Sequence, residues 1–177
     1  RLPHRRCRYA SRLNSGVRHH MDLSRYFEND DGSLPEIEIE FSSAESLQRA
    51  FSYFFDLGAE NIAVNGSYLW LRKERREEPF SGAGDAALVT DGEAESFHVV
   101  LGSINVDSHE LPALGVFVDP TSLVIDYRMG QDWSRVKVGA FVNLLKSLTA
   151  LGGNVSVARW WGVNGQKDFS RYLGSGA

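Results

Sequence analysis

The sequence predicts an α+β fold, a mostly antiparallel sheet with two main helices packed on one face. Short β-rich runs outnumber the helical patterns and follow one another through turn sequences, which is typical of antiparallel pairing. Only two long segments have helical periodicity, so the strict strand–helix alternation of doubly wound nucleotide-binding folds is missing. The 177 residues are 42% hydrophobic and 24% charged, a balance typical of one globular domain, which we expect over residues 21–177.

The first strand is expected at residues 36–41, where acidic and apolar residues alternate strictly. Period two places the apolar side chains on a buried face and Glu36, Glu38 and Glu40 on the opposite face. Successive carboxylates on that face are about 7 Å apart. We interpret this acidic face as a candidate docking surface for Lys and Arg of a partner; a face that is only solvated is the alternative.

Two helices are predicted, one that begins after Ser42 and ends at Gly58, and one over about residues 135–151. Each has an apolar stripe at helical spacing. Ser42 and Glu45 have the spacing of a capping box, which opens a helix. The remaining start and stop signals are Asp132 or Ser134 before the second helix and Gly152-Gly153 after it.

Two β-hairpins are predicted from turn sequences. Asn65-Gly66 lies between two β-rich runs within residues 62–71, and both residues accept the positive φ of a tight turn. The sequence Asp-Pro-Thr-Ser at 119–122 separates the apolar runs 115–118 and 123–127. Pro after Asp presets φ for a type I turn, so these two runs should pair as antiparallel strands.

Four further segments complete the predicted order of elements. A strand is expected over residues 97–106, with a bulge at Gly102, and a last strand over 155–161. A short terminal helix is expected over 168–173. Residues 74–94 are polar and charged and show no sustained period, which predicts a long, flexible, exposed loop.

Residues 1–20 differ in composition from the rest of the chain. They contain six Arg, no acidic residue and the single Cys, and they lack the apolar block of a secretory signal. His20-Met21 is what a common start-codon cloning site encodes, so we interpret the segment as a disordered cloning remnant outside the fold. An organelle transit peptide and a basic arm for nucleic acid are the alternatives.

Charge favours a cationic partner. Without the first twenty residues the chain has 13 basic and 23 acidic residues, a formal net charge of −10. A field of this sign repels nucleic acid and anionic membranes, so we expect a basic protein as the partner and neither nucleic acid nor a membrane. No apolar run approaches the ~20 residues of a membrane span, and a cytoplasmic location is expected. Charge that serves solubility alone is the alternative.

The search for catalytic or metal-binding patterns finds little. Residues 21–177 contain no Cys and two His, His98 and His109, too few for a zinc site. Neither His has the surroundings of a nucleophile's base in a triad, and no phosphate loop or dinucleotide motif is present. We therefore expect no cofactor, no metal and no enzymatic activity. The alternative is a small enzyme in which Glu36, Glu38 and Glu40 serve as general acid and base.

Aromatic residues offer candidate interface anchors. Trp160 and Trp161 are adjacent in the last expected strand, so period two sends them to opposite sides and exposes one of them. Exposed Trp residues often carry much of the binding energy of a protein interface. We therefore add Trp160 and Trp161 to the candidate partner-binding residues; burial of both in the core is the alternative.

One stretch resembles a known group of proteins. Leu111–Pro120, followed by Ile125–Gly130 and Trp133, resembles small bacterial immunity proteins of polymorphic toxin systems. The resemblance covers about the C-terminal half of the chain, and it carries over no site residue. It implies a cytosolic protein that binds and blocks a cognate toxin.

The hypothesis from the sequence is a non-enzymatic, acidic binding protein of the immunity type, which occludes the site of a basic toxin. An interaction module with an unknown partner and the carboxylate enzyme are the two alternatives. Gene context distinguishes the inhibitor, whose gene should lie directly beside a toxin gene. A structure distinguishes the enzyme, which needs a concave pocket with converging polar groups.

Overall fold

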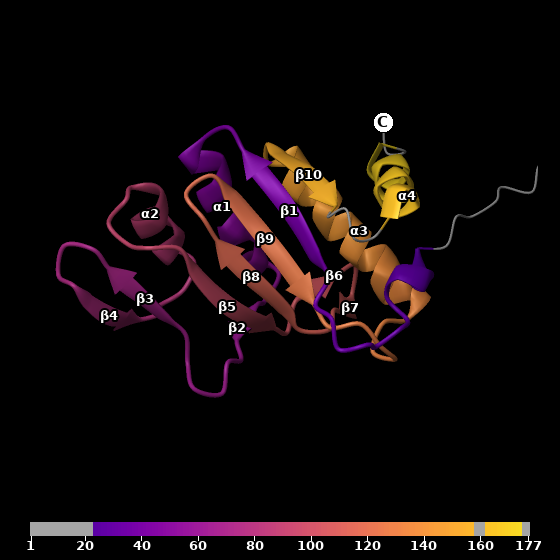
Figure 1. Cartoon of the computed structure of the whole chain (residues 1–177), viewed down its shortest axis with the longest axis horizontal. Helices are drawn as coiled ribbons and strands as arrows, with labels where there is room; N and C mark the ends of the chain where they lie inside the picture. Colours follow the sequence, from indigo (N-terminus) through magenta and orange to yellow (C-terminus); the bar gives the residue numbers. More distant parts are fainter. Residues whose placement is uncertain (1–22, 158–161, 175–177) are drawn as a thin grey trace, which may run out of the picture.

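The computed structural model describes residues 23–157 and 162–174, and these form an α+β fold (Figure 1). Its centre is a six-stranded sheet of order β10-β1-β9-β8-β5-β2. Every neighbouring pair of strands is antiparallel, which confirms the predicted fold class. The strands are β1 (Glu36–Phe41), β2 (Glu60–Asn61), β5 (Phe97–Gly102), β8 (Leu114–Val118), β9 (Ser122–Tyr127) and β10 (Gly153–Val157).

The two main helices, α1 (Ala44–Asp56) and α3 (Arg135–Ala150), lie behind the same face of the sheet in Figure 1. Both predicted helices are therefore present, with their boundaries within a residue or two. The cap of α1 is Ser43, one residue after the predicted one, and its Oγ accepts a hydrogen bond from Ser46 N at 3.2 Å. The cap of α3 is Ser134, whose Oγ accepts from Lys137 N at 3.3 Å.

Smaller elements surround this two-layer centre. A two-stranded sheet extends beyond the β5 side of the main sheet, and a second one joins the end of β5 to β8 (Figure 1). They are β3 (Tyr68–Leu71) with β4 (Arg76–Pro79), and β6 (Asn105–Val106) with β7 (His109–Glu110). The remaining helical elements are η1 (Ser24–Tyr26), α2 (Asp85–Thr90) and α4 (Gly162–Gly174).

The prediction of a long loop over residues 74–94 is wrong, because this segment contains β4 and α2. β4 has only one partner strand, so neither of its faces needs an apolar period, and its residues are nearly all charged. α2 has six residues, too few to show a helical period, and tertiary contacts hold it. Ala86 and Val89 are buried, and the carboxylate of Asp85 accepts hydrogen bonds from Ser81 N and Oγ, each at 2.6 Å.

The hairpin predicted at Asn65-Gly66 is also wrong. A turn forms one residue earlier, over residues 63–66, with Gly66 N donating to Ala63 O at 3.0 Å; Gly66 has a φ of +74° and Asn65 has no positive φ. The runs on its two sides join different sheets, since β2 pairs with β5 and β3 pairs with β4. Likewise the strand predicted over 97–106 divides at Ser103, whose φ is +59°, into β5 and β6 rather than continuing through a bulge at Gly102.

The second predicted hairpin is confirmed. β8 and β9 pair in the register Val118↔Leu123, and Asp119 N donates to Ser122 O at 2.9 Å across the turn. β10 begins at Gly153 and is described to Val157, while residues 158–161 of the predicted last strand lie outside the described residues. The terminal helix α4 is longer than the predicted 168–173.

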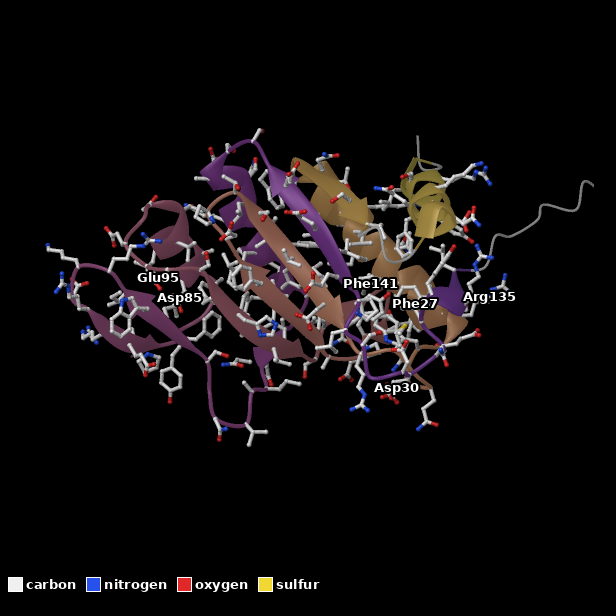
Figure 2. All side chains as sticks on the ribbon, in the orientation of Figure 1. Phe27, Asp30, Asp85, Glu95, Arg135 and Phe141 are labelled. Carbon is white, nitrogen blue, oxygen red and sulfur yellow. The ribbon has the colours of Figure 1, made fainter. Side chains whose placement is uncertain are left out.

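An aromatic cluster fixes the N-terminal part of the described chain to the sheet and α3. The ring of Phe27 lies 4.8 Å from those of Tyr127 and Trp133 and 5.9 Å from that of Phe141 (centroid distances). Figure 2 shows Phe27 and Phe141 together at this end of the sheet. Phe169 of α4 is fully buried against the same cluster, with its centroid 6.3 Å from that of Phe27. The cluster therefore joins three distant parts of the sequence.

The backbone of Gly153, the first residue of β10, is tightly enclosed by β1 and the end of α3. A Cβ there would lie 2.5 Å from Ile39 Cγ2 and 2.9 Å from the backbone oxygen of Leu148. Because one of these atoms belongs to the backbone, the clash cannot be relieved by turning a side chain. Gly153 is thus required for the packing of the helix layer on β1 and β10.

We predict that Gly153→Ala lowers the free energy of unfolding by about 2 kcal/mol, the usual cost of forcing a methyl group into a packed core. Gly139→Ala is the matched control. Gly139 lies on the exposed side of α3 with no atom within 4 Å of an added Cβ, so this change should raise stability by about 0.5–1 kcal/mol through helix propensity. Urea unfolding of both variants measures the difference; equal stabilities would contradict the packing described.

Candidate functional site

The face of the sheet opposite α1 and α3 is the candidate site, and we call it the open face. Within residues 23–157 and 162–174 no helix lies over it, and it is turned toward the viewer in Figure 1. Its side chains come from alternate positions of five strands. They are Asn154 and Ser156 of β10, Glu36, Glu38 and Glu40 of β1, Ser122, Val124 and Asp126 of β9, Phe117 of β8, and His98 and Val100 of β5.

The register of the strands orders these side chains into rows. One row crosses the whole face, because Glu38 lies opposite both Ser156 and Val124, and Val124 lies opposite Phe117. Phe117 in turn lies opposite His98. Side chains directly opposite one another are about 5 Å apart at Cβ. The row therefore runs from an acidic side through an apolar centre to a histidine.

The acidic side of the open face is where the sequence predicted it. Glu36, Glu38 and Glu40 are all exposed, on the side of β1 away from the core, and Asp126 lies directly opposite Glu36. Glu36, Glu38, Val124 and Ser156 line a shallow hollow of about 240 Å³. The six strands of the sheet contain no Lys or Arg, so no basic side chain from these strands balances the four carboxylates.

A histidine–aspartate pair spans the face. Asp126 extends across Gly115 of the intervening strand β8 and reaches His98, with 2.7 Å between His98 Nε2 and Asp126 Oδ2. A Cβ at Gly115 would collide with the Asp126 carboxylate, so glycine is what leaves room for this pair. The hydrogen bond to Asp126 raises the pKa of His98 above its ordinary value, more than partial burial lowers it, and the negative charge of Asp126 adds to the rise.

The two Trp residues predicted as anchors, Trp160 and Trp161, lie outside the described residues. The structure exposes other aromatic side chains instead. Phe117 lies in the apolar centre of the open face, with 36% of its surface exposed. Tyr68 and Trp70 of β3 are 52% and 42% exposed. They share one face of the β3–β4 hairpin, because alternate residues of a strand point the same way.

The two histidines considered for catalysis lie in different sheets. His98 is on β5 in the open face, while His109 is on β7 of the small β6–β7 hairpin. Within the described ranges, no group of three or more His, Cys, Asp or Glu residues is arranged to hold a metal ion. A search of the same ranges finds no helix with the length and apolar character that crossing a membrane requires.

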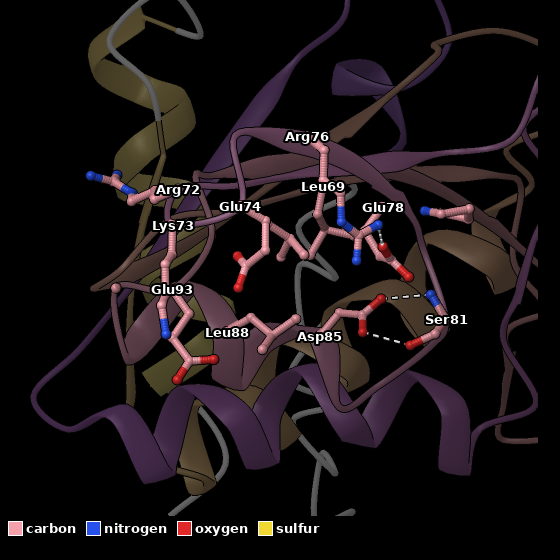
Figure 3. A pocket seen from close by; sticks show the side chains of 13 residues that line it. Leu69, Arg72, Lys73, Glu74, Arg76, Glu78, Ser81, Asp85, Leu88 and Glu93 are labelled. Atoms are coloured by element: carbon pink, nitrogen blue, oxygen red, sulfur yellow. Dashed lines mark hydrogen bonds and ion pairs between the residues drawn. The ribbon is translucent and has the colours of Figure 1, made fainter.

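A separate groove of about 590 Å³ lies between the β3–β4 hairpin and α2 (Figure 3). Its floor includes Leu69 and Leu88, and charges of both signs line its rim. Several of these charged groups are bound within the protein. Arg76 forms an ion pair with Glu78, and the Asp85 carboxylate accepts hydrogen bonds from Ser81 N and Oγ (dashed lines in Figure 3). The groove thus has no single sign of charge among its lining residues.

Comparison with known proteins finds no matching family model, no similar curated protein and no similar solved structure.

The sequence located the acidic column of the open face and missed its other half. Phe117 and Asp126 lie in predicted strands, and period two places each on the side opposite its buried neighbours, so the alternation was a usable signal. The pairing of His98 with Asp126 had no local signal. It depends on the register of three strands and on Gly115, which lies between the two residues in space but not in sequence.

We predict that Gly115→Ala breaks the His98–Asp126 pair and returns the pKa of His98 toward its ordinary value. The added methyl group would occupy the space of the Asp126 carboxylate and displace it from His98. An NMR pH titration of the assigned His98 ring signal measures this. An unchanged titration midpoint in the variant would show that the pair does not depend on Gly115.

The same pair predicts how stability depends on pH. The pKa of His98 is raised by folding, so its stabilising contribution is complete below about pH 6.5, the value in the unfolded chain, and is lost as pH rises through the higher folded pKa. Asp126→Asn should remove this contribution. Because His98 is 44% exposed, the loss at low pH should be less than about 1 kcal/mol.

Urea unfolding of the wild type and of Asp126→Asn at pH 6 and pH 8 makes the comparison. The wild type should lose its advantage over the variant between the two pH values. An advantage that is equal at both, or larger at pH 8, would contradict the assignment of the pair.

Proposed function

We propose that this chain is a non-enzymatic binding protein that docks a basic protein partner on the open face. The observation that carries the proposal is a sheet face that no helix of the described residues covers, on which Glu36, Glu38, Glu40 and Asp126 gather while the sheet strands supply no Lys or Arg. A folded sheet face without a covering layer is available to a partner, and its single sign of charge selects a cationic one.

The two sides of the face have different roles in docking. The carboxylates of β1 attract a cationic partner over about a Debye length and raise the rate of encounter. The apolar centre around Phe117 and Val124 then gives short-range contact area, which slows dissociation. Exposure of the three Glu side chains favours this role over acid–base catalysis, which needs carboxylates in a pocket that perturbs their pKa values.

We further propose that the partner is a bacterial toxin and that the chain acts as its immunity-type inhibitor in the cytoplasm. Support comes from the resemblance of Leu111–Pro120 and Ile125–Gly130 to immunity proteins, because these segments include all of β8 and the end of β9. Phe117 and Asp126 of the open face therefore fall within the resembling stretches. Inhibition would be by occlusion, with the face covering a basic substrate-binding surface of the toxin.

The test of this proposal is co-expression with the product of the gene directly beside that of this chain in its native genome. If that product is the toxin, it should arrest growth of a laboratory bacterial host when expressed alone, and co-expression of this chain should restore growth. The purified proteins should form a stable complex in size-exclusion chromatography. A neighbouring product that is harmless, or whose toxicity this chain leaves unchanged, would contradict the inhibitor assignment.

The role of the acidic column is tested by a triple variant, Glu36→Gln, Glu38→Gln and Glu40→Gln. These exposed changes should alter stability by less than about 0.5 kcal/mol each. The association rate with the partner should fall about tenfold at low salt and lose most of its salt dependence, with a smaller change in the dissociation rate.

The matched control changes three exposed carboxylates outside the open face, Glu28→Gln, Glu74→Gln and Glu110→Gln. It removes the same net charge from other surfaces and should slow association much less. Surface-binding kinetics at two ionic strengths compares the two variants. Equal effects would mean that net charge matters and the place of the carboxylates does not.

A further inference from the structure

We propose that His98 makes the open face a pH-sensitive docking surface: its protonation weakens binding of a lysine-rich partner segment, and binding of that segment expels the proton. The inference rests on the proposed docking of a cationic partner. It adds a titratable group that competes with the partner for one of the carboxylates on the face.

The competition follows from the position of Asp126. Its carboxylate lies over Gly115 of β8 and is bound to His98 Nε2 at 2.7 Å, while its backbone lies opposite that of Glu36 in β1. The Asp126 side chain is 19% exposed, so it is within reach of a partner on the face. A lysine head group that bonds to the Asp126 carboxylate would therefore compete for it with a protonated His98.

The charged groups around His98 determine how its protonation changes the charge of the open face. On β9 it meets Asp126, and β1, the strand on the other side of β9, carries Glu36 and Glu38 on the same face. β5 has two neighbouring strands, β2 and β8. Glu60 of β2 lies opposite Gly102 of β5. Asp119 directly follows β8, and its carboxylate accepts a hydrogen bond from Ser96 Oγ at 2.5 Å. All of these are acids. His98 is the one residue in the six sheet strands that can become a cation near neutral pH.

The sign of the effect follows from this arrangement. Below the pKa of His98, which Asp126 raises, the imidazolium neutralises one of the four carboxylates of the face. Above it, all four carboxylates act on the partner. By linkage, a cation that binds better to the unprotonated face must lower the pKa of His98. The free energy of this pKa change equals the difference between the binding free energies for the two protonation states. Affinity for a cationic segment should therefore rise with pH. A partner bound by a protonated histidine would show the opposite dependence, with affinity that falls as pH rises.

An N-acetylated octa-lysine amide serves as the probe, because none of its groups titrates between pH 5.5 and pH 8.5. Its affinity for the full chain is measured at low ionic strength from the amide shifts of β1, β9 and β5 in NMR titrations. We expect binding to be about threefold weaker at pH 5.5 than at pH 8.5. This is the effect on affinity of adding one unit charge about 7 Å from a lysine at an exposed site. The titration midpoint of the His98 ring should fall when the peptide is present.

His98→Gln is the decisive variant, since it keeps the half-exposed position polar and removes only the titration. Its affinity should equal that of the wild type at pH 8.5 and should not fall at pH 5.5. A pH dependence that persists in His98→Gln would overturn the proposal, because other groups would then cause it.

The remaining outcomes separate this inference from the proposed function. Binding on the open face with the same affinity at both pH values would refute the switch and leave the cationic docking surface in place. Peptide-induced shifts confined to other acidic parts of the chain, with none on β1 or β9, would refute the docking surface and the switch together.

Discussion

The apolar face of the six-stranded sheet is buried by α1 and α3, and the other features of the molecule depend on this one-sided burial. Ile37 and Ile39 of β1 are fully buried on that face, and the alternation of the strand then forces three Glu side chains to the opposite side. The helix layer approaches closely enough to require glycine at position 153. Hydrophobic burial on one side and an acidic surface on the other are thus two consequences of a single pattern.

The elements that the sequence predicted well are those whose pattern is set by this burial. β1, α1 and α3 each pack one face on the core, so a period of two or 3.6 residues marks them. The failures lie where the core does not impose a period. β4 has a single partner strand and α2 is too short, so the segment 74–94 resembled a loop. A turn does form at residues 63–66, but local sequence does not specify which sheet each flanking strand joins.

The candidate site also has one part that the sequence predicted and one part that it did not. The column of Glu side chains follows from alternation within one strand and could be predicted from six residues. The pair of His98 with Asp126 requires β5, β8 and β9 to adopt one register, with Gly115 between them, and such non-local geometry leaves no trace in a single sequence. The pair gives a face whose other charged side chains are acidic its one titratable cation within the sheet strands, and this is the physical basis of the proposed coupling of docking to pH.

The most direct test of the central claim, that the open face is the docking surface, is methyl NMR of the chain with labelled valines and the product of the neighbouring gene. Val100 and Val124 lie on the open face, while Val136 is 54% exposed on α3, in the layer behind the sheet. Complex formation should shift or broaden the signals of Val100 and Val124 and leave that of Val136 unchanged. Changes at Val136 with none at the two open-face valines would contradict the account, because the partner would then dock on the helix layer.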